Sequence, residues 1–487
     1  MLDRRQMLLA GGAAALLGGC SAGSMGRPAS ISSPTAAPPT PSPTPIATAD
    51  LFADMQQRTF RFFWERSNPA NGLMVDRWPT PSFSSIAATG FALTAYPIGV
   101  KHGWITRDQA RARTLATLRF FWTAPQGDAP TGMAGYKGFF YHFLDMNTGL
   151  RFQQNELSSV DTSWLLAGVL FAGQYYDRAD EAEIRDLSAK IYARCDWRWF
   201  QQQDAQKRVS MGWHPESGFI ATPWFGYTEG QILYVLALGA PDFYLDKDAY
   251  DGWCSTYTNS WRGSGATRHL GFGPHFAHQY TQCWLDMRGI RDATMRDAGF
   301  DYFENSRRAT YWQRNYAMQN PGKWVGYSQD IWGLTACDGP GGVQAMVNGT
   351  QRQFTGYSAR GPIGLPDGFD DGTIAPTAVV GSLPFAPEIV EPATQALYAR
   401  YGSAIYGEYG FLDAFNPSFT FADQPYEHGK ITAAAGWVDS DFLGFDQGPV
   451  VLMIENQQSG MVWDAMRSHP AIKRGLQRAG FTGGWLG

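Results

Sequence analysis

Hydrophobic and polar positions along the chain alternate between two kinds of helical segment. Residues 160–173 (VDTSWLLAGVLFAG) are apolar on almost every side, whereas residues 180–198 (DEAEIRDLSAKIYARCDWR) have one apolar and one polar face. Ser, Thr or Asp precedes several such segments and Gly or Pro follows them, as helix caps require. The pattern predicts helices at 51–67, 84–101, 106–122, 158–177, 180–203, 228–238, 275–289, 292–304, 373–382, 388–401 and 449–458.

Fully buried helices that alternate with half-exposed helices indicate two concentric layers, as in an (α/α) toroid. No second Pro/Ser-rich linker and no block of like charge interrupts the chain after residue 50. No fixed repeat of about 20–50 residues is visible, which disfavours a regular solenoid. We therefore predict an all-α fold and one large domain over residues 50–487.

The first twenty residues, MLDRRQMLLAGGAAALLGGC, have the pattern of an export signal. The apolar stretch from Met7 to Gly19 is too short to span a bilayer. Leu17-Gly18-Gly19-Cys20 resembles a bacterial lipobox, in which Cys20 becomes lipidated; ordinary cleavage that leaves a free Cys20 is the alternative. Residues 21–49 are rich in Pro, Ser and Thr and form a linker. We expect a periplasmic protein, or a lipoprotein of the outer membrane of a Gram-negative bacterium, with membrane contact only through lipid on Cys20.

Composition narrows the class of function. Charged residues make up 17% of the chain and the net charge is −5, so the basic surface that nucleic acid requires is missing. The 18 Trp, 22 Tyr and 31 Phe supply a large core, and some of their rings could stack on sugar faces. Residues 50–487 contain no G-x-S-x-G motif, P-loop or dinucleotide fingerprint. His275 and His278 lack an obvious third metal ligand, so core or sugar-contacting roles are favoured for them.

Glu229 is the best candidate for an acid. In TPWFGYTEGQILYVLAL (222–238) it shares a helical stripe with Ile232, Leu233 and Leu236, which predicts a carboxylate on the buried side. Cleavage of a glycosidic bond needs one protonated carboxyl group and one ionised carboxylate. The aromatic residues before Glu229 would raise its pKa, whereas the helix N-terminus would lower it. A glutamate that only stabilises the helix end is the alternative.

Glu156 and Asp161 form a second candidate cluster, in NELSSVDTSWLLAG. Ser158 and Asp161 have the spacing of a capping box with Asp in place of Glu, so Asp161 is either a helix cap or a functional acid. Glu156 precedes the cap, at the mouth of a buried helix, where a substrate group could reach it.

Two further acidic sites precede predicted helices. Asp370 and Asp371 could bind calcium or a sugar hydroxyl, although a solvated turn is the more common role of such a pair. Asp446 is expected just before a helix whose first turn contains Pro449. Its alternative role is an interaction with the helix end.

Ten motifs, in order along the chain, resemble motifs of the bacterial glucoamylase-like family. They are RFFWE (61–65), SIAATGFAL (85–93), GFFYHFLD (138–145), ELSSVDTSWLLAG (156–168), WFGYTEGQILYVLALG (224–239), HQYTQCWLDMRG (278–289), WGLTACDGP (332–340), FTGYSARGP (354–362), DDGTIAPTA (370–378) and GFDQGPVVLMIEN (444–456). That family includes the endo-β-1,2-glucanases of glycoside hydrolase family 144. The resemblance implies an (α/α)6 barrel, no metal or cofactor, and hydrolysis of β-1,2-glucan with inversion.

The resemblance also implies roles for individual residues. Glu229 of the Y-x-E motif corresponds to the general acid, whereas Asp161, Asp371 and Asp446 all lie in matching motifs, so the base stays open. The candidate substrate-binding residues are Glu156, Tyr141, Trp224, Tyr227, His278, Trp332, Tyr357 and Arg360. The expected partner is an oligosaccharide or polysaccharide, and the chain is expected to act as a monomer. Endo or exo action stays open.

Two other functions are compatible with the sequence. One is an (α/α)-barrel polysaccharide lyase with Tyr141 and His142 as base and acid, although the clustered Arg or Lys residues that would neutralise a uronate are not evident. The other is a non-catalytic surface lipoprotein that binds glycans through its aromatic residues. Release of reducing ends from a panel of glucans separates these functions.

Overall fold

Six helices that are buried along most of their length form the inner layer of a barrel in residues 47–487, the part of the chain that this computed structural model describes. These inner helices are α3 (Ile86–Lys101), α5 (Ser159–Tyr175), α8 (Gln231–Gly239), α10 (Tyr280–Trp284), α13 (Pro376–Val380) and α15 (Gly444–Gln458). The predicted signal peptide with Cys20, and nearly all of the predicted linker, lie outside the described residues.

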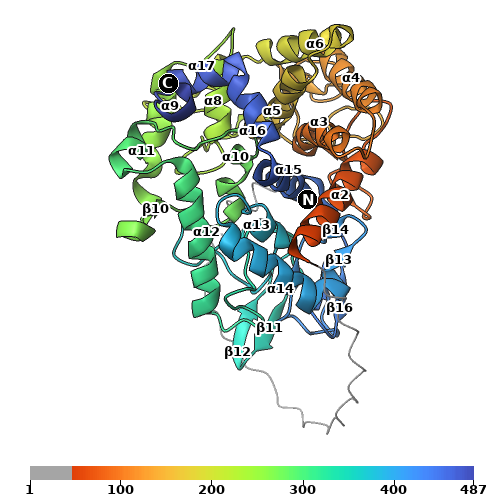
Figure 1. Cartoon of the computed structure of the whole chain (residues 1–487), viewed down its shortest axis with the longest axis vertical. Helices are drawn as coiled ribbons and strands as arrows, with labels where there is room; N and C mark the ends of the chain where they lie inside the picture. Colours follow the sequence, from red (N-terminus) through yellow and green to blue (C-terminus); the bar gives the residue numbers. More distant parts are fainter. Residues whose placement is uncertain (1–46) are drawn as a thin grey trace.

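A second layer of helices surrounds the first (Figure 1). These outer helices are α2 (Thr48–Arg66), α4 (Arg107–Thr123), α6 (Ala182–Ala193), α12 (Tyr302–Gln319), α14 (Pro387–Ile405) and α17 (Pro470–Arg478). Helix α6 packs on α5, α17 on α8, α14 on α13, and α2 on α15, which lies between α3 and α13. The predicted all-α fold is confirmed as an (α/α)6 barrel.

The remaining elements lie in the connections between these helices. Four short helices are α7 (Trp197–Phe200), α9 (Lys247–Cys254), α11 (Ala293–Ala298) and α16 (Met461–Ser468). The strands are two to four residues long: β1 (Arg77–Trp78), β2 (Ser84–Ser85), β3 (Gly135–Tyr136), β4 (Phe139–Phe140), β5 (Phe143–Leu144), β6 (Leu157–Ser158), β7 (Gly212–His214), β8 (Gly218–Phe219), β9 (Trp261–Arg262), β10 (His269–Leu270), β11 (Gln344–Val347), β12 (Thr350–Gln353), β13 (Tyr406–Gly407), β14 (Gly410–Phe411), β15 (Phe415–Asn416), β16 (Lys430–Thr432), β17 (Gly436–Val438) and β18 (Phe442–Leu443).

All strand pairs are antiparallel, and several of them join loops that precede different inner helices. The pairs are β1–β18, β2–β5, β3–β4, β9–β10, β11–β12 and β13–β14, and the three-stranded groups are β6–β7–β8 and β15–β17–β16. Arg77 lies opposite Leu443, so β1 and β18 hold the loop before α3 against the first turn of α15.

Two glycines let helices α3 and α5 approach closely. A Cβ atom on Gly90 would lie 2.2 Å from the carbonyl oxygen of Trp164, and a Cβ on Gly168 would lie 2.1 Å from that of Gly90. A larger residue at either position would therefore push the helices apart. Gly90 and Trp164 both lie in the first half of their helices. The N-termini of α3 and α5 therefore lie at the same end of the barrel.

The inner helices α10, α13 and α15 also begin close to one another. Tyr280, the first residue of α10, donates its hydroxyl to Asp446 Oδ1 near the start of α15, at 2.9 Å. Thr377, near the start of α13, donates its hydroxyl to the backbone carbonyl of Asp446 at 2.7 Å. Three inner helices thus begin around one residue, so their N-termini also converge.

Several helix boundaries differ from the sequence prediction. The segment predicted as one helix at 292–304 contains two helices, because Gly299 adopts a left-handed φ of 83° and ends α11 before α12 begins. The helix predicted at 180–203 is also divided, into α6 and α7. The helix predicted at 275–289 is a 3₁₀ turn followed by the short α10.

Helix α15 begins five residues earlier than predicted, at Gly444. Asp446 therefore lies within the first turn of the helix, and Pro449 lies inside the helix. Pro449 is the sixth residue of α15, beyond the first turn where it was predicted, and it removes the intrahelical N–H donor that the carbonyl of Phe445 would otherwise meet. Among the described residues, no helix has the length and apolar character that a membrane span needs.

Candidate active site

A cavity of about 1080 Å³ lies where the loops before five inner helices meet. Its walls come from the segments that precede α3, α5, α8, α13 and α15. The lining residues are Arg77, Thr80, Pro81, Ser82, Phe83, Phe143, Phe152, Gln153, Gln154, Asn155, His214, Glu216, Ser217, Phe219, Ile220, Ala221, Asp338, Tyr357, Glu427 and His428. Because the inner helices begin at this end, their positive N-terminal dipoles lie near it.

Glu229 lines a second, smaller pocket of about 140 Å³ together with Trp224, Phe225 and Tyr227. The side chain of Glu229 is buried, as the sequence predicted, but the predicted helical stripe is not the reason for its burial. Glu229 precedes helix α8, and all nine residues of α8 are buried, so the helix has no polar face. Thr281 of α10 donates its hydroxyl to the backbone carbonyl of Glu229 at 3.3 Å, which fixes this segment against the next inner helix.

The aromatic residues before Glu229 connect its loop to neighbouring helices. Trp224 donates its indole N–H to Ser159 Oγ, in the first turn of α5, at 3.0 Å. The ring of Tyr227 lies 5.1 Å from the ring of His278, and both side chains are buried. Burial raises the pKa of the Tyr227 phenol and lowers the pKa of His278, so both groups stay neutral at neutral pH.

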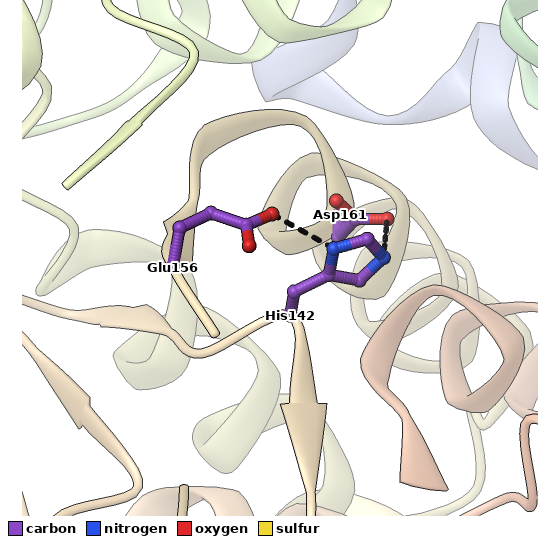
Figure 2. Close-up of side chains that lie close together, drawn as sticks. All are labelled: His142, Glu156 and Asp161. Atoms are coloured by element: carbon purple, nitrogen blue, oxygen red, sulfur yellow. Dashed lines mark hydrogen bonds and ion pairs between the residues drawn. The ribbon is translucent and has the colours of Figure 1, made fainter. Parts of the chain in front are cut away.

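Glu156, His142 and Asp161 lie in a row (Figure 2). His142 Nδ1 is 2.8 Å from Glu156 Oε1, and His142 Nε2 is 3.4 Å from Asp161 Oδ1. Ser158 is the N-cap of α5, because its Oγ accepts from the backbone N–H of Asp161 at 3.1 Å, which is one of the two hydrogen bonds of the predicted capping box. The Asp161 carboxylate points to Ser158 Oγ with one oxygen and to His142 with the other. Each ring nitrogen of His142 therefore faces one carboxylate oxygen.

Asp371 lies in a buried ion pair and not in a solvated turn. Arg360 donates to both of its oxygens, at 2.8 and 2.9 Å, and neither side chain is exposed. Burial opposes ionisation of Asp371, yet the Arg360 guanidinium and hydrogen bonds from Thr373 hold its pKa below the usual value. Asp370 is buried beside it and accepts hydrogen bonds from Tyr316, Trp324 and Tyr327.

Asp446 belongs to a second group of buried acids. Besides accepting from Tyr280, its side chain lies close enough to that of Asp413 to influence the pKa of Asp413. Burial and the nearby charge of Asp338 raise the pKa of Asp413 to about 7. Asp413 therefore carries a proton over much of the neutral range.

Sequence reasoning missed the charged pair that lines the large cavity. Arg77 Nη1 lies 2.7 Å from Asp338 Oδ2, and further contacts join Arg77 to Asp441 at 3.4 Å and to Asp76 at 3.5 Å. Asp338 lies in the motif WGLTACDGP (332–340), which could have marked it as a candidate site residue. An acid in a turn is common, however, so the residue type alone did not distinguish it. In the sequence analysis, His142 was a candidate only as the acid of the alternative lyase.

The other predicted binding residues fall into two groups. Tyr357 lines the large cavity. Tyr141, Trp332, Arg360 and His278 are buried and do not line either of these two pockets. Tyr141 lies under the guanidinium of Arg151, 4.6 Å from the ring centre, and burial raises the pKa of its phenol. A lyase base needs a lowered phenol pKa, so this environment disfavours the lyase.

The fold and the site together define the class of protein. It is an (α/α)6 barrel with carboxylates gathered at the N-terminal end of its inner helices. Residues 221–470 match the model of the glucoamylase-like family, described as "Putative glucoamylase". The chain belongs to this family, and the resemblance seen in the sequence is confirmed.

Similar proteins include enzymes with stated substrates. The exo β-1,2-glucooligosaccharide sophorohydrolase (non-reducing end) of Parabacteroides distasonis is 28% identical over 466 residues, which are 89% of this chain and 58% of the relative. The chain thus spans little more than half of the length of that relative.

Solved structures match over nearly the whole described chain. A protein of the same family description from Bacteroides uniformis has a TM-score of 0.77 and 29% identity, with 91% of this chain and 100% of that chain covered. An endo-β-1,2-glucanase from Chitinophaga pinensis, in complex with sophorotriose and glucose, has a TM-score of 0.75 and 25% identity, with 91% and 100% covered.

Proposed function

We propose that the chain is a glycoside hydrolase that cleaves β-1,2-glucan or its oligosaccharides. The observation that carries this proposal is the position of Glu229, a buried acid in an aromatic pocket at the end of the barrel where further buried carboxylates gather. The names of the similar enzymes support the linkage: one is an exo-acting sophorohydrolase and one is an endo-β-1,2-glucanase.

Glu229 acts as the general acid in this proposal. Its aromatic surroundings disfavour a charged carboxylate, so a proton can be kept on it until the glycosidic oxygen takes that proton. The bond between the anomeric carbon and that oxygen then breaks. Water supplies the new bond to the anomeric carbon, and its proton passes to a base.

We assign the base to Asp161, with Asp446 as the alternative. Asp161 lies on the helix to which the loop of Glu229 is bound through Trp224 and Ser159. Asp446 occupies the equivalent third position of α15 but lies beside Asp413, another buried acid. Asp371 is the weakest candidate, because it is fully buried in an ion pair with Arg360, whose charge is permanent and holds the pKa of Asp371 low.

The test is a panel of purified glucans with β-1,2, β-1,3, β-1,4, β-1,6 and α-1,4 linkages, in which reducing ends are measured. We expect release from β-1,2-glucan, and the sizes of the early products distinguish endo from exo action. Binding without any release would support the glycan-binding lipoprotein. An unsaturated product that absorbs ultraviolet light, from a uronate-containing polymer, would support the lyase.

We also propose that the chain is exported as a monomer and anchored by lipid on Cys20, which lies outside the described residues. The expected result is that the full chain partitions with membranes, whereas a chain truncated to begin at Thr48 stays in the soluble fraction and keeps its activity. Cys20→Ser is the matched control. Equal partitioning of the full chain and Cys20→Ser would contradict the anchor, and light scattering tests the monomer.

A further inference from the structure

His142 lies between two buried carboxylates that come from one neighbouring segment of the chain (Figure 2). It directly precedes β5, Glu156 directly precedes β6, and Asp161 lies in the first turn of α5. The exposed fractions are 6% for His142, 0% for Glu156 and 2% for Asp161. Water can therefore replace these contacts only to a small extent.

The two contacts of the ring require more protons than a neutral imidazole has. Ionised carboxylates only accept hydrogen bonds, and a neutral imidazole carries a single N–H. A neutral ring can therefore donate to Glu156 or to Asp161, but not to both. An imidazolium donates to both, and the three groups then carry a net charge of −1 instead of −2. A neutral ring beside one protonated carboxyl group would have the same net charge, but imidazole is the stronger base by about 2 pKa units, which favours the proton on the ring.

The surroundings of the ring favour the lower net charge. Phe143 stacks on the ring with centroids 3.8 Å apart. Beyond Glu156 lie His214 of β7, whose pKa is lowered by burial, and Arg151, which is paired with Glu216 at 2.6 Å. The positive charge of Arg151 is thus paired mainly with Glu216. Two ionised carboxylates beside a neutral ring would therefore be unfavourable in this buried site.

We propose that His142 is a positioning residue that is protonated on both ring nitrogens at neutral pH and thereby orients the Asp161 carboxylate. The proposal rests on the proposed function, in which Asp161 is the base. Ser158 contacts the second Asp161 oxygen, so the carboxylate is held from both sides. As the pH rises and the ring loses its second proton, that support of Asp161 is lost.

Two substitutions at His142 separate the two ring contacts. In His142→Gln the amide nitrogen lies near the position of Nε2 and can donate to Asp161 without titrating. In His142→Asn it lies near the position of Nδ1 and can donate only toward Glu156. We expect His142→Asn to lower kcat by about tenfold or more with little change in KM. We expect His142→Gln to keep more of kcat and to lose the alkaline fall in rate that His142 causes. Equal rates and identical pH profiles in both variants and the unaltered chain would overturn the proposal.

A measurement without activity separates this inference from the proposed function. In the full chain labelled with ¹⁵N-histidine, the signal absent from the His142→Gln spectrum belongs to His142. At neutral pH we expect both of its ring nitrogens in the protonated range, and a signal of the neutral ring would overturn the proposal. If the ring is protonated but no glucan is cleaved, the proposed function fails while the protonation of His142 stands.

Discussion

Trp224 donates its indole N–H to Ser159 Oγ at 3.0 Å, and this bond joins the loop of the candidate acid to the helix of the candidate base. Trp224 lines the pocket beside Glu229, and Ser159 lies two residues before Asp161 on α5. Ser159 Oγ also lies within 2.9 Å of the carbonyl of Met211, another wall residue of that pocket. The bond between Trp224 and Ser159 thus ties together the two segments that carry these acids.

Trp224→Phe should disturb the relative position of these segments while it keeps an aromatic ring in the pocket. The loss of one buried hydrogen bond should lower the free energy of unfolding by about 1 kcal/mol, with a further loss from the smaller ring. Because a shift of about 1 Å between catalytic groups can cost 10²-fold in rate, kcat should fall far more than KM rises. Urea unfolding and steady-state kinetics measure both effects.

Trp253→Phe is the matched control for that experiment. Trp253 is equally buried, but among the described residues its indole N–H has no hydrogen-bond partner. The control therefore loses the same ring area without losing a hydrogen bond, and its kcat should stay near that of the unaltered chain. A similar loss of kcat in both variants would contradict the positioning role of Trp224.

Glu229→Gln tests the general acid directly. Gln has nearly the same shape and should preserve the fold, but it has no proton to give to the leaving oxygen. We expect kcat on β-1,2-glucan to fall by about 10²–10⁴ with an unchanged melting temperature. Glu183→Gln, on the exposed face of α6, is the control and should keep full activity. Near-normal turnover of Glu229→Gln would withdraw the assignment.

The sequence predicted the barrel well because the burial pattern of its helices is local information. Helices α3 and α5 are apolar all round and are found in the inner layer, as expected. The approach of Gly90 to Trp164, in contrast, depends on which helices become neighbours. The boundaries of short helices such as α10 were missed because only five residues carry their pattern.

The sequence predicted individual residues of the site but not how they are arranged in space. Glu229 and Asp161 were found because acids in apolar segments are unusual. The same reasoning could not distinguish Asp371, which neutralises Arg360, from an acid that faces substrate, because the two residues are brought together by the fold. The proximity of His142 to Glu156 is likewise a product of strand pairing, since Tyr141 pairs with Leu157.

Asp371→Asn should destabilise the protein in a way that depends on pH. The substitution leaves the buried Arg360 unpaired, which should cost about 3–5 kcal/mol at pH 7. The folded-state pKa of Asp371 is lowered, so its contribution is present above the unfolded-state pKa and is lost as the pH falls through the folded-state value. The difference between the unaltered chain and Asp371→Asn should therefore shrink in acid.

Unfolding by urea at pH 7 and at about pH 3 measures this difference. Glu183→Gln serves again as the control, because its ion pair with Arg119 is exposed and screened by water. This control should show no comparable loss at either pH. A loss in Asp371→Asn that stays constant from neutral to acid pH would contradict the role of ionised Asp371.

The stereochemistry of the product tests how Glu229 works with its base. An inverting site holds its two carboxyl groups about 6.5–9.5 Å apart, which leaves room for the attacking water, whereas a retaining site holds them about 5–5.5 Å apart. With Asp161 as a base that takes a proton from water, the bond to the anomeric carbon forms on the face opposite the leaving oxygen. A β-linked glucan should therefore yield the α-anomer first, which NMR detects before mutarotation. A first product in the β-anomeric form would require a covalent intermediate on a carboxylate, and Asp161 would then have to be a nucleophile instead of a base.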